Sequence, residues 1–236
     1  MKLAIMQPYL FPYIGYFQLI NVVDKFVIYD DVNFIKQGWI NRNNILVQGK
    51  SLMFTVPLVN QSSFAKIKEI EVNSKLYDSW KKKFLRTIEQ SYKKAPYFKE
   101  VFNIISNVVD VQGNENLISE VATKSLVATS NYLGLKTEFV FTSEVYGNQI
   151  LSGPERVIDI CKKENGTQYI NPIGGQELYS QEVFEQSGLD LKFIKSLPLS
   201  YDQFSGDFVP WLSMIDVLMF NSIDEIKLLL EKFELI

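Results

Sequence analysis

The sequence predicts an α/β fold, a mixed and largely parallel sheet with flanking helices and a helical middle subdomain. Short apolar runs typical of buried strands alternate along the chain with longer stretches that have helical spacing. The first two runs, Lys2–Met6 and Lys25–Tyr29, are separated by a single short helical stretch, Phe17–Val23. This order is that of a strand–helix–strand unit, which places the two strands side by side and parallel.

The segment between the first strand and the first helix is a sharp turn. Gln7–Gly15 contains two prolines and a glycine, which interrupt regular structure. The second strand ends at Asp30 and Asp31. Because open α/β sheets bind ligands at the carboxyl ends of their strands, this N-terminal region is the first place to look for function.

A hairpin and several helices are predicted in the middle of the chain. Ile45–Val47 and Leu52–Leu58 form the hairpin strands around a turn at 48–50, and Ile67–Val72 has the mixed pattern of a half-buried strand. We expect one α/β domain over residues 1–236, with 74–133 as a helical insertion. The predicted helices are Tyr77–Tyr92, with Ser74 as its cap, Tyr97–Val111, and Asn116–Leu133, with Asn114 as N-cap and Gly134 as C-terminal stop.

The last third of the chain returns to alternating strands and helices. Pro154 suits the first turn of the helix that opens this part, and Pro210 suits the first turn of a later one. The predicted elements are strand Phe139–Thr142, helix Gly153–Lys163, strand Gln168–Asn171, helix Gln181–Ser187, strand Asp190–Ile194, and helices Phe208–Phe220 and Ile223–Phe233.

Composition excludes several classes of chemistry. The chain has no histidine and one cysteine, Cys161, which lies in an apolar helix and is expected to be buried and inert. Ser-His-Asp and Cys-His catalysis, histidine metal sites and intrachain disulfides are therefore excluded. Any acid–base chemistry has to come from Asp, Glu, Lys, Tyr or backbone groups. With a net charge of −3, the chain also lacks the basic surface that a nucleic-acid partner requires.

The apolar N-terminus does not resemble a targeting segment. Two prolines interrupt it, and no small-residue cleavage site follows. We therefore expect no signal peptide, no membrane insertion and a cytoplasmic location.

The turn after the first strand is a candidate ligand site. Free backbone N–H groups converge where a helix begins, and anions bind there. The candidate substrate-binding residues of this turn are Gln7, Tyr9, Gly15 and Tyr16. The turn is faintly similar to the H-x-G-H turn of class I nucleotidyltransferases, with tyrosines in place of both histidines. The alternative is a rigid turn with packed tyrosine rings.

Asp30 and Asp31 are the candidate catalytic residues. Two acids at a strand end could bind an amine, a sugar hydroxyl or a metal ion. Alternatively, one of them caps the following turn, so function is favoured for only one of the pair. No third carboxylate lies nearby in the sequence, and we therefore expect no metal site.

The strongest local signal is the amide-rich segment 37–43. Arg42 is a planar cation suited to phosphate or carboxylate, Asn41 and Asn43 flank it with amide donors, and Trp39 offers a stacking face. Together with Gln37 they match the needs of a nucleotide or nucleotide sugar. The alternative is a loop whose asparagine side chains satisfy backbone groups.

Two weaker candidate sites occur later in the chain. A glycine-rich bend follows the strand at 168–171, and a polar group near the C-terminus falls at helical spacing. An ordinary turn and a core helix, respectively, are the favoured alternatives. The candidate substrate-binding residues are Gly174, Gln176 and Tyr179 in the bend, and Tyr201, Gln203, Ser213 and Asp216 near the C-terminus.

Several of these stretches together resemble one family. The chain is similar to the WbqC-like family along nearly its whole length, and the order of the motifs makes the resemblance specific. Many members have histidine where this chain has Met6. The matching stretches are QPYLFPYIGYF, FVIYDDVNFIKQGWINRN, the TVPL strand, Trp80 in its helix, YINPIGGQELY and YDQFSGDFVPWLSMIDVL.

The resemblance implies a biological setting. Members are encoded with bacterial O-antigen, lipopolysaccharide and other surface-polysaccharide genes and are often described as transferases. We therefore expect a transferase that moves a small acyl or aminoacyl group to a nucleotide-linked amino sugar. In this hypothesis Asp30 or Asp31 accepts the amine proton, Arg42 with its two asparagines holds a phosphate or carboxylate, and Trp39 or Tyr9 stacks on a ring.

Two alternatives remain open at this stage. One is a nucleotidyltransferase-like enzyme that binds a nucleotide at the first turn, and the other is a non-catalytic protein that binds glycan precursors. The expected partner is a small molecule, a nucleotide sugar. The residues indicate no particular cofactor, and they leave open whether the chain forms a homodimer.

Overall fold

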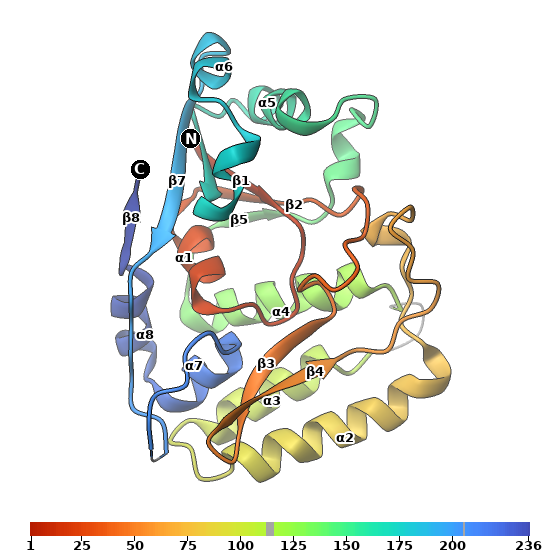
Figure 1. Cartoon of the computed structure of the whole chain (residues 1–236), viewed down its shortest axis with the longest axis vertical. Coiled ribbons are helices and arrows are strands. Elements are labelled where there is room, and N and C mark those ends of the chain that lie inside the picture. Colours follow the sequence, from red (N-terminus) through yellow and green to blue (C-terminus); the bar gives the residue numbers. More distant parts are fainter. Residues whose placement is uncertain (112–115, 205) are drawn as a thin grey trace.

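The computed structural model describes residues 1–111, 116–204 and 206–236 (Figure 1). Its centre is a six-stranded sheet with the order β5-β2-β1-β6-β7-β8, which is parallel except for β8. The predicted α/β class with a mixed, largely parallel sheet is confirmed. The strands are β1 Lys2–Met6, β2 Lys25–Ile28, β5 Glu138–Val140, β6 Gln168–Pro172, β7 Asp190–Ser196 and β8 Phe233–Leu235.

Both faces of the sheet are apolar and covered by helices. Leu3 and Ile5 of β1 pack with α5 and α6, whereas Ala4 between them packs with α1, α4 and α8 on the opposite face. Alternate side chains of a strand point to opposite faces, which explains the continuous apolar runs. The helices described are α1 Ile14–Val22, α2 Ser74–Tyr92, α3 Phe98–Val108, α4 Ile118–Leu133, α5 Gly153–Lys163, α6 Gln181–Gln186, α7 Met214–Phe220 and α8 Ile223–Leu230.

A separate antiparallel hairpin packs against the helices of the middle region. Its strands are β3, Arg42–Val47, and β4, Lys50–Thr55, and β3 contacts α2 and α7, away from the central sheet (Figure 1). The Phe54 ring lies 4.7 Å from the Phe84 ring of α2. None of the helices in the described part of the chain has both the length and the apolar composition that a bilayer crossing requires.

One predicted element is wrong, and another begins later than predicted. Ile67–Val72 is not a strand but begins with a 3₁₀ turn, η1, at Ile67–Glu69, in which the Glu69 carboxylate accepts a hydrogen bond from the Lys66 N–H at 3.0 Å. The helix predicted from Phe208 begins only at Met214, where the Ser213 hydroxyl accepts the Ile215 N–H at 3.2 Å. These side chains satisfy the backbone locally, and Pro210 consequently lies outside the helix.

Several predicted boundaries also change. The first helix begins at Ile14 rather than Phe17. The last helix ends at Leu230 rather than Phe233, and Phe233 instead begins the strand β8, which was not predicted. Asn73, not Ser74, occupies the N-cap of α2. The predicted cap Asn114 lies outside the described residues. Gly134 ends α4 with a φ of 70°, as predicted.

Gly15 in the first turn of α1 permits a close approach of neighbouring side chains. A Cβ atom built there would meet the Tyr13 ring and lie 2.5 Å from the Ser196 hydroxyl. We therefore expect Gly15→Ala to lower the free energy of unfolding by about 1–3 kcal/mol, although alanine favours helices. Gly174→Ala is the matched control, because a Cβ there meets no atom within 4 Å. Urea titration measures both, and equal stability of the two variants would contradict the prediction.

Candidate functional site

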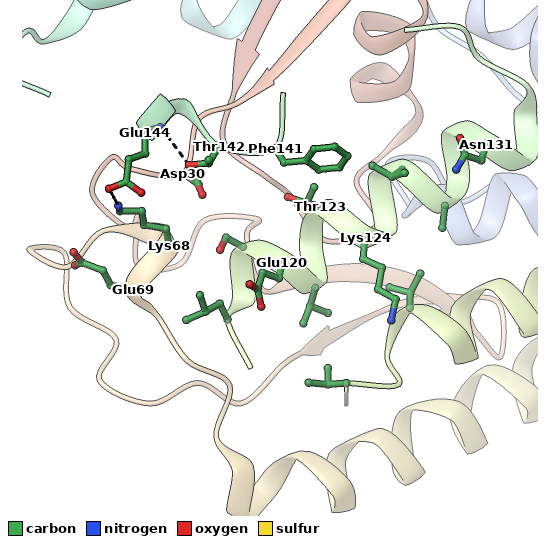
Figure 2. A pocket seen from close by; sticks show the side chains of 17 residues that line it. Asp30, Lys68, Glu69, Glu120, Thr123, Lys124, Asn131, Phe141, Thr142 and Glu144 are labelled. Atoms are coloured by element: carbon green, nitrogen blue, oxygen red, sulfur yellow. Dashed lines mark hydrogen bonds and ion pairs between the residues drawn. The ribbon is translucent and has the colours of Figure 1, made fainter. Parts of the chain in front are cut away.

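A cavity of about 940 Å³ opens where β2 and β5 end (Figure 2). Asp30 follows β2, Thr142 follows β5, and Lys68 of η1 and Thr123 of α4 line the same space. This volume is in the range of small-molecule sites. The apolar part of the wall consists of Val108, Val111, Leu117, Val121, Val127, Ala128 and Phe141.

Asp30 is a buried carboxyl group in the cavity wall. Its Oδ1 accepts hydrogen bonds from the Thr142 hydroxyl at 2.7 Å and from the Ser143 N–H at 3.2 Å. Burial raises the pKa of Asp30 above its ordinary value, and the two hydrogen bonds only partly oppose this effect. The group is therefore a stronger proton acceptor than an exposed aspartate.

Asp31 has a different environment, although it is the next residue. It accepts hydrogen bonds from Arg156 Nη2 at 2.5 Å and from the Ser143 hydroxyl. Burial alone would raise the pKa of Asp31, but these two donors outweigh it and hold the pKa below its ordinary value. Ser143 thus bonds both acids, through its N–H to Asp30 and through its hydroxyl to Asp31.

Arg156 forms an ion pair with Asp31, and the sequence analysis did not identify it as a candidate. It lies in α5, where its Nε donates to the Asn148 side chain at 2.9 Å, and its guanidinium lies 5.0 Å from the centre of the Tyr29 ring. A signal existed in the sequence: Arg156 directly precedes the apolar residues Val157 and Ile158. A charged side chain that is buried in this way requires a partner, which is Asp31.

The charges around the cavity are predominantly acidic. Lys68 forms an ion pair with Glu144 (Figure 2), and Lys124 donates to the Asp110 carbonyl at 3.3 Å. An excess of acids in a recessed wall creates a negative potential, which attracts an ammonium group more than a phosphate. The charged lining residues are Asp30, Glu69, Glu120 and Glu144 on the acidic side and Lys68 and Lys124 on the basic side.

The amide-rich segment holds its own loop together. Arg42 donates through Nε to the Gly38 carbonyl at 2.9 Å, hydrogen-bonds the Gln37 carbonyl and lies 5.9 Å from the centre of the Trp39 ring. Asn41 donates to the Val56 carbonyl at 2.9 Å. Arg42 and Asn41 thus bond backbone carbonyls, which is the kind of contact expected in a loop whose side chains satisfy backbone groups.

The first turn is fixed by three polar side chains from distant segments. Asn43 and Ser213 donate to the Phe11 carbonyl at 2.8 and 2.6 Å, and the Ser125 hydroxyl accepts the Phe11 N–H at 3.0 Å. The structure therefore brings Asn43 and Ser213 to the predicted turn. Both of them bond its backbone.

The tyrosines of the first turn are packed against it. Tyr16 is buried and donates to the Gln7 carbonyl at 2.7 Å, and the Tyr9 ring lies 5.5 Å from the Tyr16 ring. The Gln7 side-chain oxygen is buried and has no hydrogen-bond partner among the described residues. This oxygen is an acceptor that a ligand or water could satisfy.

Two of the C-terminal candidates, Tyr201 and Gln203, bond the buried carboxylate of a third, Asp216. Tyr92 donates to its Oδ1 at 2.8 Å, while Tyr201 and Gln203 donate to its Oδ2 at 2.6 and 2.8 Å. Burial raises the pKa of Asp216 despite these three donors. The cluster connects α2, the segment before α7, and α7 itself.

The candidate residues of the glycine-rich bend do not line the large cavity. Gly174 and Gln176 are exposed in the 3₁₀ segment η3, Ile173–Leu178. The Tyr179 ring packs 5.6 Å from Tyr169 and 5.7 Å from Phe184. Among the described residues, Asp30 is the only predicted site residue that lines the large cavity, and Tyr201 lines a second one. The functional roles of all the candidates remain predictions.

The described residues contain no group of three or more His, Cys, Asp or Glu side chains that could hold a metal ion. The polar side chains that line the large cavity carry carboxylates, hydroxyls, the Asn131 amide and the ammonium groups of Lys68 and Lys124.

The fold and cavity define an α/β protein with a small-molecule-sized cavity at the carboxyl edge of a largely parallel sheet. The chain belongs to the WbqC-like protein family, whose model matches residues 7–228, and the predicted family is thus confirmed. It is 30% identical over 223 residues to a Mycobacterium tuberculosis (strain ATCC 25618 / H37Rv) protein named "Uncharacterized protein Rv1507c", and the match covers 93% of each chain. No solved structure matches.

Proposed function

We propose that the protein is a transferase that acylates the amine of a nucleotide-linked amino sugar in surface-polysaccharide precursor metabolism. The observation that carries this proposal is the buried Asp30 carboxylate in the wall of the large cavity. The family resemblance supplies the biological setting.

Asp30 would act as the general base. The amine nitrogen attacks the carbonyl carbon of an activated acyl donor, such as a thioester or acyl phosphate, and the N–C bond forms. The bond from that carbon to the sulfur or phosphate oxygen breaks, and the leaving group departs with its electron pair. The amine proton passes to the Asp30 carboxylate, which needs only to lie within hydrogen-bond distance of the nitrogen.

The charges of the cavity support an amine-bearing substrate. The acidic excess of the wall concentrates cations, so the amino sugar would lie next to Asp30. Lys68 is ion-paired with Glu144 in this wall, and the Arg42 guanidinium bonds the carbonyls of Gly38 and Gln37. The charge of the cavity therefore supports the amine of the substrate and not its phosphate.

The nucleotidyltransferase alternative has less support. It requires a phosphate to approach the turn at Gly15. The Tyr13 ring and the Ser196 hydroxyl already occupy the space next to the Gly15 Cα. The non-catalytic alternative, a protein that binds glycan precursors, differs from the transferase in that it would bind the nucleotide sugar without forming product.

The purified protein should be incubated with UDP-glucosamine and either acetyl-coenzyme A or acetyl phosphate, with UDP-N-acetylglucosamine as the control whose amine is blocked. We expect N-acetylated product by mass spectrometry, and a rise in melting temperature with the free amine that exceeds the rise with the control. A rise in melting temperature without product would favour the precursor-binding protein. Neither product nor a rise would contradict the proposal.

A further inference from the structure

A second cavity, of about 330 Å³, lies towards the β7 side of the sheet. Its walls come from the start of α1, from residues 196–199 at the end of β7 and just beyond it, and from residues 210–212 before α7. It shares no lining residue with the Asp30 cavity. The proposed transferase chemistry therefore does not use it.

Aromatic rings, prolines and aliphatic side chains form the walls of this second cavity. Tyr13, Tyr201, Phe208 and Trp211 line it together with two prolines. Two of its polar side chains are engaged, because Tyr201 donates to Asp216 at 2.6 Å and Ser196 donates to the Gln18 side chain at 2.6 Å. A group that enters would find flat apolar faces and few unsatisfied hydrogen-bonding groups, which favours an uncharged ligand.

The segment 197–213 supplies much of this wall, and hydrogen bonds join two of its described residues. Its described residues form neither helix nor strand. Even so, Gln203 donates to the Val209 carbonyl at 3.2 Å and accepts the Val209 N–H at 2.9 Å. Long irregular segments are uncommon in compact domains and are usually either functional or linkers, and internal hydrogen bonds in such a segment lower the entropic cost of binding.

Trp211, which lies at the edge of this wall, has an exposed aromatic ring and a strained backbone conformation. Its side chain is 74% exposed, and its φ is +61°, which is a strained conformation for a bulky residue. Its ring lies 6.1 Å from the Tyr13 ring at an angle of 57°. Backbone strain at an exposed aromatic residue points to function rather than to stability.

We infer that the second cavity binds a flat apolar ring, the aromatic group of a small molecule, against Tyr13 and Trp211. A cavity of about 150 Å³ accommodates benzene, so this one has room for one or two fused rings and is too small for a whole nucleotide sugar. This inference is independent of the proposed function, because the two cavities are separate.

Isothermal titration with indole tests the inference on the full chain, with n-hexanol as an aliphatic probe of similar size. We expect indole to bind and n-hexanol to bind more weakly. Trp211→Gly should weaken indole binding about tenfold. Its melting temperature should stay within about 2 °C of the wild type, because glycine tolerates the positive φ.

Phe64→Ala is the control, because Phe64 is 90% exposed and lies outside this cavity. Phe208→Leu is a second cavity variant, which should weaken the binding of indole and leave that of n-hexanol unchanged. The inference is overturned by any one of three results: no indole binding to the wild type, wild-type affinity in both cavity variants, or equal affinity for indole and n-hexanol.

Discussion

Replacing Asp30 with asparagine is expected to lower the kcat of the proposed amine acylation by about 10²- to 10⁴-fold. Asparagine keeps the shape of the side chain and an oxygen that can accept from Thr142 and Ser143, but it cannot take up the amine proton. Steady-state kinetics with UDP-glucosamine and the active acyl donor measure the effect. A kcat within a few-fold of the wild type would show that Asp30 is not the base.

Glu120→Gln is the matched control for the charge of the cavity. Glu120 also lines the cavity, and the substitution removes one negative charge from the same wall. If Glu120 only attracts the ammonium group, its loss should raise KM and leave kcat nearly unchanged. A similar loss of kcat in both variants would indicate a general electrostatic effect and not a base at Asp30.

The pH dependence gives a further readout for Asp30. A general base has to be ionised, so activity falls as the pH drops through the pKa of that group. Because burial raises the pKa of Asp30, the acidic limb of the profile is expected at a higher pH than for an exposed aspartate. Thr142→Val removes a donor to Asp30 and should move this limb to a still higher pH.

Replacing Arg156 with methionine is expected to lower the free energy of unfolding by about 3–5 kcal/mol. The substitution leaves the Asp31 carboxylate buried without its cation and removes the Arg156 bond to Asn148. Urea titration at neutral pH measures the loss. Arg86→Met is the control, because Arg86 is exposed on α2 and should change stability by less than about 0.5 kcal/mol.

Two further measurements connect this loss to the ion pair. The double variant with Asp31→Asn should lose less than the sum of the single variants, since both charges are then absent. The folded pKa of Asp31 lies below the reference value of 3.8. Its stabilising contribution is therefore present above that value and is lost as the pH falls through the folded pKa, so the difference between wild type and Arg156→Met should shrink in acid. A difference that does not depend on pH would contradict an ion-pair origin.

The fold class was predictable because strong local signals agree with the tertiary structure. The buried strands are short apolar runs with apolar neighbours on both faces, and Pro154 and Gly134 mark helix ends by their backbone preferences. β8 was missed because Phe233–Leu235 is a short edge strand that follows directly on the amphipathic pattern of α8. Its pairing with β7 is a tertiary contact that no local pattern reveals.

The site was predictable only in part. Asp30 follows a strand, and its place at the carboxyl edge of the sheet follows from that position. The cavity around it was not predictable, because its walls include Lys68, Thr123 and Thr142, which are far apart in the sequence. The composition of the amide-rich segment is equally compatible with a ligand-binding loop and with a loop whose side chains bond its own backbone. The sequence does not show that Arg42 bonds the carbonyls of Gly38 and Gln37.

The position of β1 in the sheet has a consequence for biosynthesis. β1 is made first, yet it lies between β2 and β6, so one of its edges has no partner until Gln168 has left the ribosome. An apolar strand with an open edge can pair with other chains during that interval. We therefore expect nascent chains truncated before β6 to aggregate or to be retained by chaperones, and the sheet to close late in translation.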